Sequence, residues 1–128
     1  MRTDILDIRV TGVGSSLCVT LSGELDLYTS ASLAPFLIEV SKGDAQDIAL
    51  DLTHLQYIDS TGLMQIVRVY RLARRRSRTF TVHVLEGSIV QRVLRLIGAG
   101  DLFPIVIEPN TAGSSSKGLA GSAEMPSD

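Results

Sequence analysis

The segment Asp59-Ser60-Thr61-Gly62 is the part of the sequence best suited to chemistry. An aspartate followed by two hydroxyl residues is typical of the first turn of a helix, with Asp59 as the N-cap. The N–H groups and the positive dipole end of such a turn tolerate an anion such as phosphate. Gly62, which has no side chain, leaves the backbone open to a close neighbour. The segment predicts either an ordinary cap, which contributes about 1 kcal/mol, or a functional hydroxyl at a helix end.

Two elements must position this hydroxyl. Alternating apolar residues predict a buried strand over 47–52, followed by a short loop that contains His54 and leads to Asp59. After the segment, apolar residues recur at helical spacing until 74–76. Ser60 should therefore lie where a buried strand gives way to a helix.

The remaining elements complete an alternating pattern. We expect strands over 4–10, 16–21, 79–85 and 102–107, and helices from about Ser32 to 42–43 and over 89–97. The order β-β-α-β-α-β-α-β predicts an α/β domain over 1–108, with a mixed, mostly parallel sheet of four to five strands flanked by helices. Residues 109–128, rich in Gly and Ser, read as a disordered tail.

The composition limits the classes of function. The chain has 128 residues, of which 45% are hydrophobic and 20% charged, so one domain can bury its own core. The single cysteine cannot form an internal disulfide or a zinc site, and no long apolar run predicts secretion or membrane spanning. The absence of a cysteine framework favours a cytoplasmic protein, and nothing in the sequence requires more than a monomer. We expect no binding to nucleic acid or membranes, because the net charge is only -2.

The charge is unevenly distributed along the chain. Residues 1–60 hold nine acidic and three basic side chains, a net charge of -6, whereas residues 61–108 hold eight arginines and three acids, a net charge of +5. In the helical projection Arg68, Arg71 and Arg75 lie away from the apolar stripe, which favours a solvated outer face. Nucleic-acid binding would need aromatic side chains among these arginines, and only Tyr70 and Phe80 are near.

The sequence offers little support for an enzyme. It contains no nucleophile elbow, phosphate-binding loop, dinucleotide fingerprint or HExxH zinc motif. His54, in the predicted loop, and His83, on the polar side of a strand, are poorly placed as general bases. A small hydrolase or phosphotransferase with Ser60 as its nucleophile therefore lacks a matched base.

Three motifs together resemble the STAS domain, and within it the anti-sigma factor antagonists of bacteria. They are Leu21-Ser22-Gly23-Glu24-Leu25-Asp26, Ile58-Asp59-Ser60-Thr61-Gly62-Leu63 and Gly98-Ala99-Gly100-Asp101-Leu102-Phe103-Pro104-Ile105. The resemblance implies a partner that is both an anti-sigma factor and a serine kinase with a histidine-kinase-like ATP fold. This kinase would phosphorylate Ser60, with Thr61 as an alternative acceptor. The unphosphorylated form would bind the kinase and free the sigma factor, and a phosphatase would restore that form.

The resemblance also implies a partner-binding surface and no catalytic residue, cofactor or metal in this chain, since ATP and magnesium would belong to the kinase. The residues expected on that surface are Glu24, Asp26, Asp59, Ser60, Thr61, Gly62, Leu63 and Met64. A phosphoryl group adds about -1.5 to -2 charge yet suits a helix N-terminus, so the switch should act at the surface rather than through the fold. The alternative is a STAS scaffold subunit of a stressosome-like or lipid-transport complex.

Overall fold

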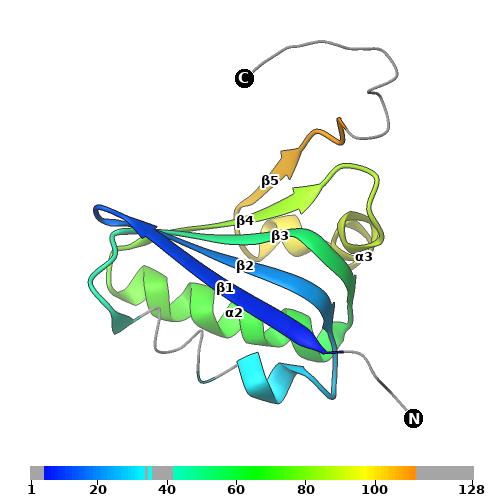
Figure 1. The fold of residues 1–128 in the computed structure, drawn as a ribbon, viewed down its shortest axis with the longest axis horizontal. Coiled ribbons are helices and arrows are strands. Elements are labelled where there is room, and N and C mark those ends of the chain that lie inside the picture. Colours follow the sequence, from blue (N-terminus) through cyan, green and yellow to red (C-terminus); the bar gives the residue numbers. More distant parts are fainter. Residues whose placement is uncertain (1–4, 34, 36–41, 112–128) are drawn as a thin grey trace.

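Five strands form one mixed sheet in the computed structural model, which describes residues 5–33, 35 and 42–111 (Figure 1). They lie in sequence order across the sheet, and β1 pairs antiparallel with β2 while β2 to β5 run parallel. The strands are β1 (Leu6–Val13), β2 (Ser16–Leu25), β3 (Asp47–Ile58), β4 (Thr79–Leu85) and β5 (Ile105–Glu108). The predicted α/β fold with a mostly parallel sheet is confirmed.

The helices α2 (Ser60–Arg75) and α3 (Ile89–Ile97) pack on one face of the sheet, and a 3₁₀ turn (Ala99–Asp101) follows α3. Residues 30–33 and 35 are also helical, so the helix expected from Ser32 begins at Ser30. The rest of that expected helix includes residues 34 and 36–41, which lie outside the described residues.

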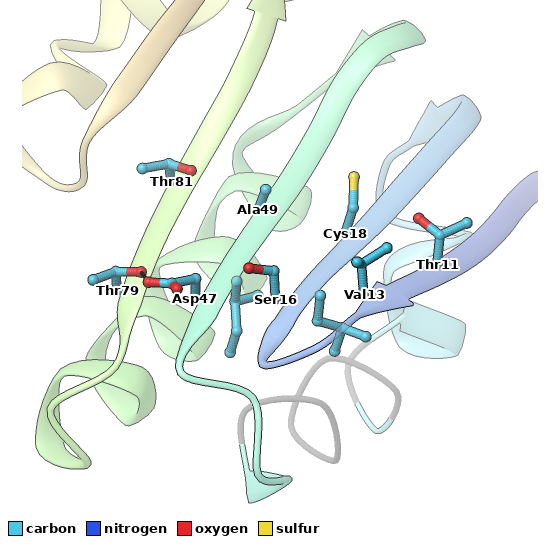
Figure 2. A pocket seen from close by; sticks show the side chains of 10 residues that line it. Thr11, Val13, Ser16, Cys18, Asp47, Ala49, Thr79 and Thr81 are labelled. Atoms are coloured by element: carbon cyan, nitrogen blue, oxygen red, sulfur yellow. Dashed lines mark hydrogen bonds between the residues drawn. The ribbon is translucent and has the colours of Figure 1, made fainter.

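The core lies between the helices and the covered face of β2, β3 and β4. Every second side chain of each strand points into this core, because successive side chains of a β-strand point to opposite faces of the sheet. The strand residues of this face are Val19, Leu21, Ile48, Leu50, Leu52, Phe80, Val82 and Val84, all at most 3% exposed. On the opposite face Cys18, Ala49 and Thr81 are only half-buried, and no described element covers them (Figure 2). The described helices α2 and α3 therefore cover the same face of the sheet.

Three strands extend further than the sequence pattern predicted: β1 runs to Val13 rather than Val10, and β2 and β3 extend further still. β2 continues to Leu25 and β3 to Ile58, so the predicted loop before Asp59 is absent and His54 lies in β3. The two strands pair along this extension with register shifts between Thr20 and Ser22 and between Gly23 and Glu24. Such irregularities disturb the alternation of apolar and polar side chains, which is why periodicity ended both strands too early.

The C-terminal edge strand β5 is shorter than expected. It starts at Ile105 rather than Leu102, because the 3₁₀ turn and Pro104 occupy the preceding residues. Exposed Pro104 and Pro109 flank it on both sides. The expected tail lies outside the described residues from residue 112 onward. Among the described residues, no helix has the length and apolar character needed to cross a membrane.

Candidate functional site

Asp59 is the N-cap of α2, as the sequence predicted. Its backbone is extended, with φ -117° and ψ -176°, and its Oδ1 accepts a hydrogen bond from the Gly62 N–H at 3.0 Å. Its Oδ2 accepts a second one from the Leu27 N–H at 3.0 Å. The Asp59 N–H in turn donates to the Leu25 carbonyl at 3.2 Å. One side chain thus fixes both the start of α2 and the segment that follows β2.

That segment is a tight turn organised by Asp26 and Thr29. The Asp26 carboxylate accepts hydrogen bonds from the N–H groups of Tyr28 at 2.9 Å and Thr29 at 3.0 Å. The Thr29 hydroxyl donates to the Glu24 carbonyl at 2.7 Å and accepts from the Asp26 N–H at 2.9 Å. Because Asp26 is 5% and Thr29 9% exposed, these bonds are shielded from water and hold the turn firmly.

Gly62 brings the first turn of α2 against the end of β2. A Cβ at this position would lie 2.6 Å from Leu25 Cγ and 2.7 Å from the Leu25 carbonyl oxygen. The close neighbour that the glycine admits is therefore Leu25 of the same chain. Gly62 and Leu63 are both buried and pack the first turn of α2 against the rest of the domain.

Ser60 presents an exposed side chain at the start of α2. It is the first residue of α2, and in the described part of the chain its side chain has no hydrogen-bond partner. Thr61 is half-buried beside it. Among the described residues, neither hydroxyl is bonded to a basic side chain of the kind that activates a serine nucleophile.

Exposed apolar side chains occur on the segments that adjoin Ser60, which are the turn after β2, the end of β3 and the first turns of α2. Of these side chains the sequence indicated only Met64. Leu27 is 62%, Tyr28 71% and Tyr57 41% exposed, and Met64, one helical turn after Ser60, is 55% exposed. Leu27 and Tyr28 project from the turn that Asp59 and Asp26 hold. In the sequence both residues follow the first motif directly and lie between the strand predicted over 16–21 and the helix predicted from Ser32. Exposed aromatic and aliphatic side chains of this kind mark protein contact surfaces.

The acidic residues Glu24 and Asp59 are both half-buried, and Asp59 stands at the start of α2. Glu24 is paired with Tyr57 in the register of β2 and β3. The residues expected on the partner-binding surface lie at the end of β2 and at the start of α2, and they differ in burial. Ser60 and Met64 are exposed, whereas Asp26, Gly62 and Leu63 are buried. Direct contact of these three buried residues with a partner stays a prediction.

Comparison with known proteins identifies the family. The family model described as "Mlab, STAS domain" matches residues 8–107, which span nearly all of the sheet and both helices. This chain belongs to the STAS domain family. Among curated relatives, the anti-sigma F factor antagonist of Paenibacillus polymyxa is 33% identical over 90 residues, covering 70% of this chain and 76% of the relative. The similarity extends to the anti-sigma factor antagonists within the family.

Solved structures agree on the fold of this STAS domain. The crystal structure of an anti-sigma factor antagonist from Mycobacterium paratuberculosis superposes with a TM-score of 0.71 at 22% identity, covering 78% of this chain and 84% of that one. The Bacillus anti-sigma factor antagonist SpoIIAA in its unphosphorylated form gives a TM-score of 0.66 at 15% identity, covering 86% and 95%. At these identities the likeness concerns the fold alone.

The first motif of the STAS domain owes its glycine to a close approach. Gly23 has a φ of 103°, and a Cβ there would overlap the carbonyl oxygen of Ile5. The register of β2 shifts at this residue, and Glu24 and Leu25 then lead into the Asp26 turn. The glycine therefore allows the backbone conformation and the close strand contact with which β2 continues to the Asp26 turn.

The other polar groups of the STAS domain lie away from Ser60. His54 is exposed on β3 and contacts the Thr53 hydroxyl at 3.3 Å, and His83 pairs with Glu108 at 2.7 Å on the uncovered face. A hollow of about 240 Å³ opens on that face near Asp47 and Thr79, at the start of β3, whereas Ser60 follows its end (Figure 2). In the residues described, no three His, Cys, Asp or Glu side chains gather to hold a metal ion.

Proposed function

We propose that this STAS domain is a phosphorylation-controlled antagonist of an anti-sigma factor. The unphosphorylated form binds an anti-sigma factor that is also a serine kinase with a histidine-kinase-like ATP fold, and this releases the sigma factor. Phosphorylation of Ser60 by that kinase ends the interaction, and a phosphatase reverses it. The observation that carries the proposal is the exposed Ser60 at the start of α2, whose hydroxyl has no hydrogen-bond partner among the described residues. Exposed Met64 follows one helical turn later, and exposed Leu27 is tied to the neighbouring Asp59. Family membership supplies the class of partner.

The support beneath Ser60 favours a switch that leaves the fold intact. Asp59 caps the helix through Gly62 and anchors the turn at Leu27, and neither bond involves the Ser60 side chain. A phosphoryl group at this position meets the positive end of the helix dipole. Phosphorylation therefore changes the charge and bulk of the surface while the elements below it stay in place.

The added charge is large enough to control binding. With an effective dielectric of about 20, one added like-charge pair at about 6 Å costs roughly 3 kcal/mol before screening by salt. This corresponds to a loss of affinity of about a hundredfold. The bulk of the phosphoryl group among Leu27, Tyr28 and Met64 would also separate an apolar contact. Thr61, which is half-buried, is a poorer acceptor than Ser60.

The test is a pull-down from native cell extract with Ser60→Ala and Ser60→Asp proteins as paired baits. Ser15→Asp is the matched control, because it adds the same charge to an exposed turn at the far end of β2. We expect a histidine-kinase-like ATPase on the Ser60→Ala and Ser15→Asp baits and none on Ser60→Asp. Incubation of the unmodified protein with that ATPase and ATP should then place the phosphate on Ser60, read by peptide mass spectrometry.

Equal capture of the ATPase by both Ser60 variants would show that Ser60 is not the switch. Phosphate found on Thr61 alone would show that Thr61, and not Ser60, is the phosphate acceptor. Labelling of Ser60 by a serine-reactive probe in the isolated protein would instead support the hydrolase or phosphotransferase alternative.

A second candidate function is that of a STAS scaffold subunit in a larger assembly, such as a stressosome-like or lipid-transport complex. Exposed apolar side chains on α3 and β5 favour it: Ile89 is 60%, Leu96 79%, Ile97 45% and Ile107 53% exposed. Size-exclusion chromatography distinguishes the two functions. A stable large complex in the extract that also survives with Ser60→Asp would support the scaffold.

A further inference from the structure

Helix α2 carries a row of arginines that continues the line of Ser60 and Met64. Arg68, Arg71 and Arg75 follow these two residues at intervals of three or four, so all five lie on one side of the helix. The three arginines are exposed. At a rise of 1.5 Å per residue, the row extends roughly 22 Å from Ser60 to Arg75. We call Arg68, Arg71 and Arg75 the arginine row.

The arginine row has no role within the described structure. None of its three guanidinium groups has a hydrogen bond or ion pair with any described residue, and α2 itself contains no Asp or Glu. Arg74 differs, because its guanidinium donates to the Tyr70 hydroxyl at 3.1 Å and lies 5.8 Å from the centre of that ring.

The arrangement works against helix stability. Like charges three and four residues apart repel one another on a helix surface. Arginines in the last turn gain from the helix dipole, but this effect fades within one turn and does not reach Arg68 or Arg71. A repulsive row of charges with no ionic partner in the described part of the chain is better explained by an external anionic partner than by folding.

The surface between the arginines indicates the kind of partner. A hollow of about 270 Å³ is lined by the row together with Met64, Val67 and Leu72. An apolar floor with a guanidinium rim fits an apolar side chain flanked by carboxylates. An acidic protein segment supplies both.

Nucleic acids and membranes fit this surface less well. Single-stranded nucleic acid binds to basic grooves with aromatic platforms, but Tyr70 packs toward Phe80 and Phe103, with ring centres 6.1 and 6.4 Å away. A membrane-surface helix inserts its apolar face into the lipid. The apolar face of α2 is already buried in the core through Leu63, Ile66 and Ala73.

We propose that the arginine row is an electrostatic docking surface for an acidic segment of the same anti-sigma factor kinase that contacts Ser60. This rests on the proposed function, and it adds a second contact along α2 that phosphorylation does not modify. The row attracts the partner over about a Debye length, and the surface around Ser60 then decides whether contact is completed.

The experiment uses the ATPase captured by the Ser60→Ala bait, purified and titrated with the unphosphorylated protein in calorimetry. The test variant is Arg68→Gln/Arg71→Gln/Arg75→Gln, and the charge-reversed Glu variant is a second measurement. The matched control is Arg92→Gln/Arg95→Gln, because both residues are exposed arginines on α3. Circular dichroism checks that each variant is folded.

We expect the Gln variant to bind about 30-fold more weakly at about 50 mM NaCl, the Glu variant more weakly still, and the control as the wild type does. The difference should shrink strongly at about 500 mM NaCl. Equal affinities of wild type and both row variants would overturn the docking surface while the proposed function stands. If the wild type itself binds no such ATPase, the proposed function fails and the docking surface falls with it.

Two probes test the other anionic partners. Vesicles of phosphatidylglycerol and phosphatidylcholine and a short DNA duplex are titrated with wild type and the Gln variant. We expect neither probe to bind. The proposal would be overturned if the wild type bound one of these probes, the Gln variant did not, and both proteins bound the ATPase equally well. The arginine row would then be assigned to that ligand.

Discussion

The Asp59 carboxylate accepts a hydrogen bond from the backbone N–H of Leu27 at 3.0 Å, across 32 residues of sequence. Its other oxygen caps α2 through Gly62. The most exposed apolar residues near Ser60 are thereby fixed relative to the helix that presents Ser60. Asp59 thus joins two segments that are far apart in the sequence into one fixed unit.

Replacement of Asp59 by Ala should remove both bonds and lower the free energy of unfolding by about 2 kcal/mol. Asp59→Ser is the matched control, since a serine hydroxyl still caps the helix but is too short to reach Leu27. Urea denaturation measures stability, and amide hydrogen exchange locates the loss. We expect Asp59→Ala to accelerate exchange at both Gly62 and Leu27, and Asp59→Ser at Leu27 alone. Unchanged exchange at Leu27 in both variants would contradict the double anchor.

Gly62→Ala should destabilise the protein by about 2 kcal/mol or more, because the new methyl group meets the Leu25 main chain and the first turn of α2 must shift. Gly100→Ala is the control: no atom lies within 4 Å of a Cβ there, so a change within about 0.5 kcal/mol is expected. Thermal unfolding followed by circular dichroism compares the two. Similar melting temperatures would mean that α2 and β2 separate more easily than their packing implies.

Thr29→Val keeps the shape of the side chain and removes its hydroxyl. The Asp26 N–H and the Glu24 carbonyl would then lose buried hydrogen bonds, and we expect a loss of about 2 kcal/mol. Thr11→Val is the control, because Thr11 is exposed on β1 and should tolerate the change within about 0.5 kcal/mol. Chemical denaturation measures both variants. Equal stability would show that the turn holds without Thr29.

Ser60→Asp should leave the free energy of unfolding within about 0.5 kcal/mol of the wild type, because an acidic residue in the first turn of a helix is favourable. Ser88→Ala is a useful comparison: Ser88 caps α3 by accepting from the Gln91 N–H at 3.0 Å, and its loss should cost about 1 kcal/mol. Differential scanning calorimetry distinguishes the two. A strong destabilisation by Ser60→Asp would contradict a switch confined to the surface.

The local features of the site could be predicted from the sequence. Asp59 as N-cap, Ser60 in the first turn and the apolar stripe of α2 follow from short-range rules, and the structure confirms them. The features that depend on distant contacts could not. Gly62 indicated a close neighbour without identifying Leu25, and the register shifts of β2 and β3 hid the strand that leads directly to Asp59. Leu27 and Tyr28 lie in a turn that Asp26 and Asp59 hold through hydrogen bonds, and short-range rules do not predict which side chains such a turn exposes.

The short final strand bears on self-association. β5 has only four residues at the edge of the sheet, and Pro104 and Pro109 on either side lack the N–H groups that a longer ladder would need. A foreign strand aligned there would find too few pairing groups to hold it. The β5 edge of the mixed sheet is therefore a poor template for aggregation, although Val106 and Ile107 on that strand are exposed.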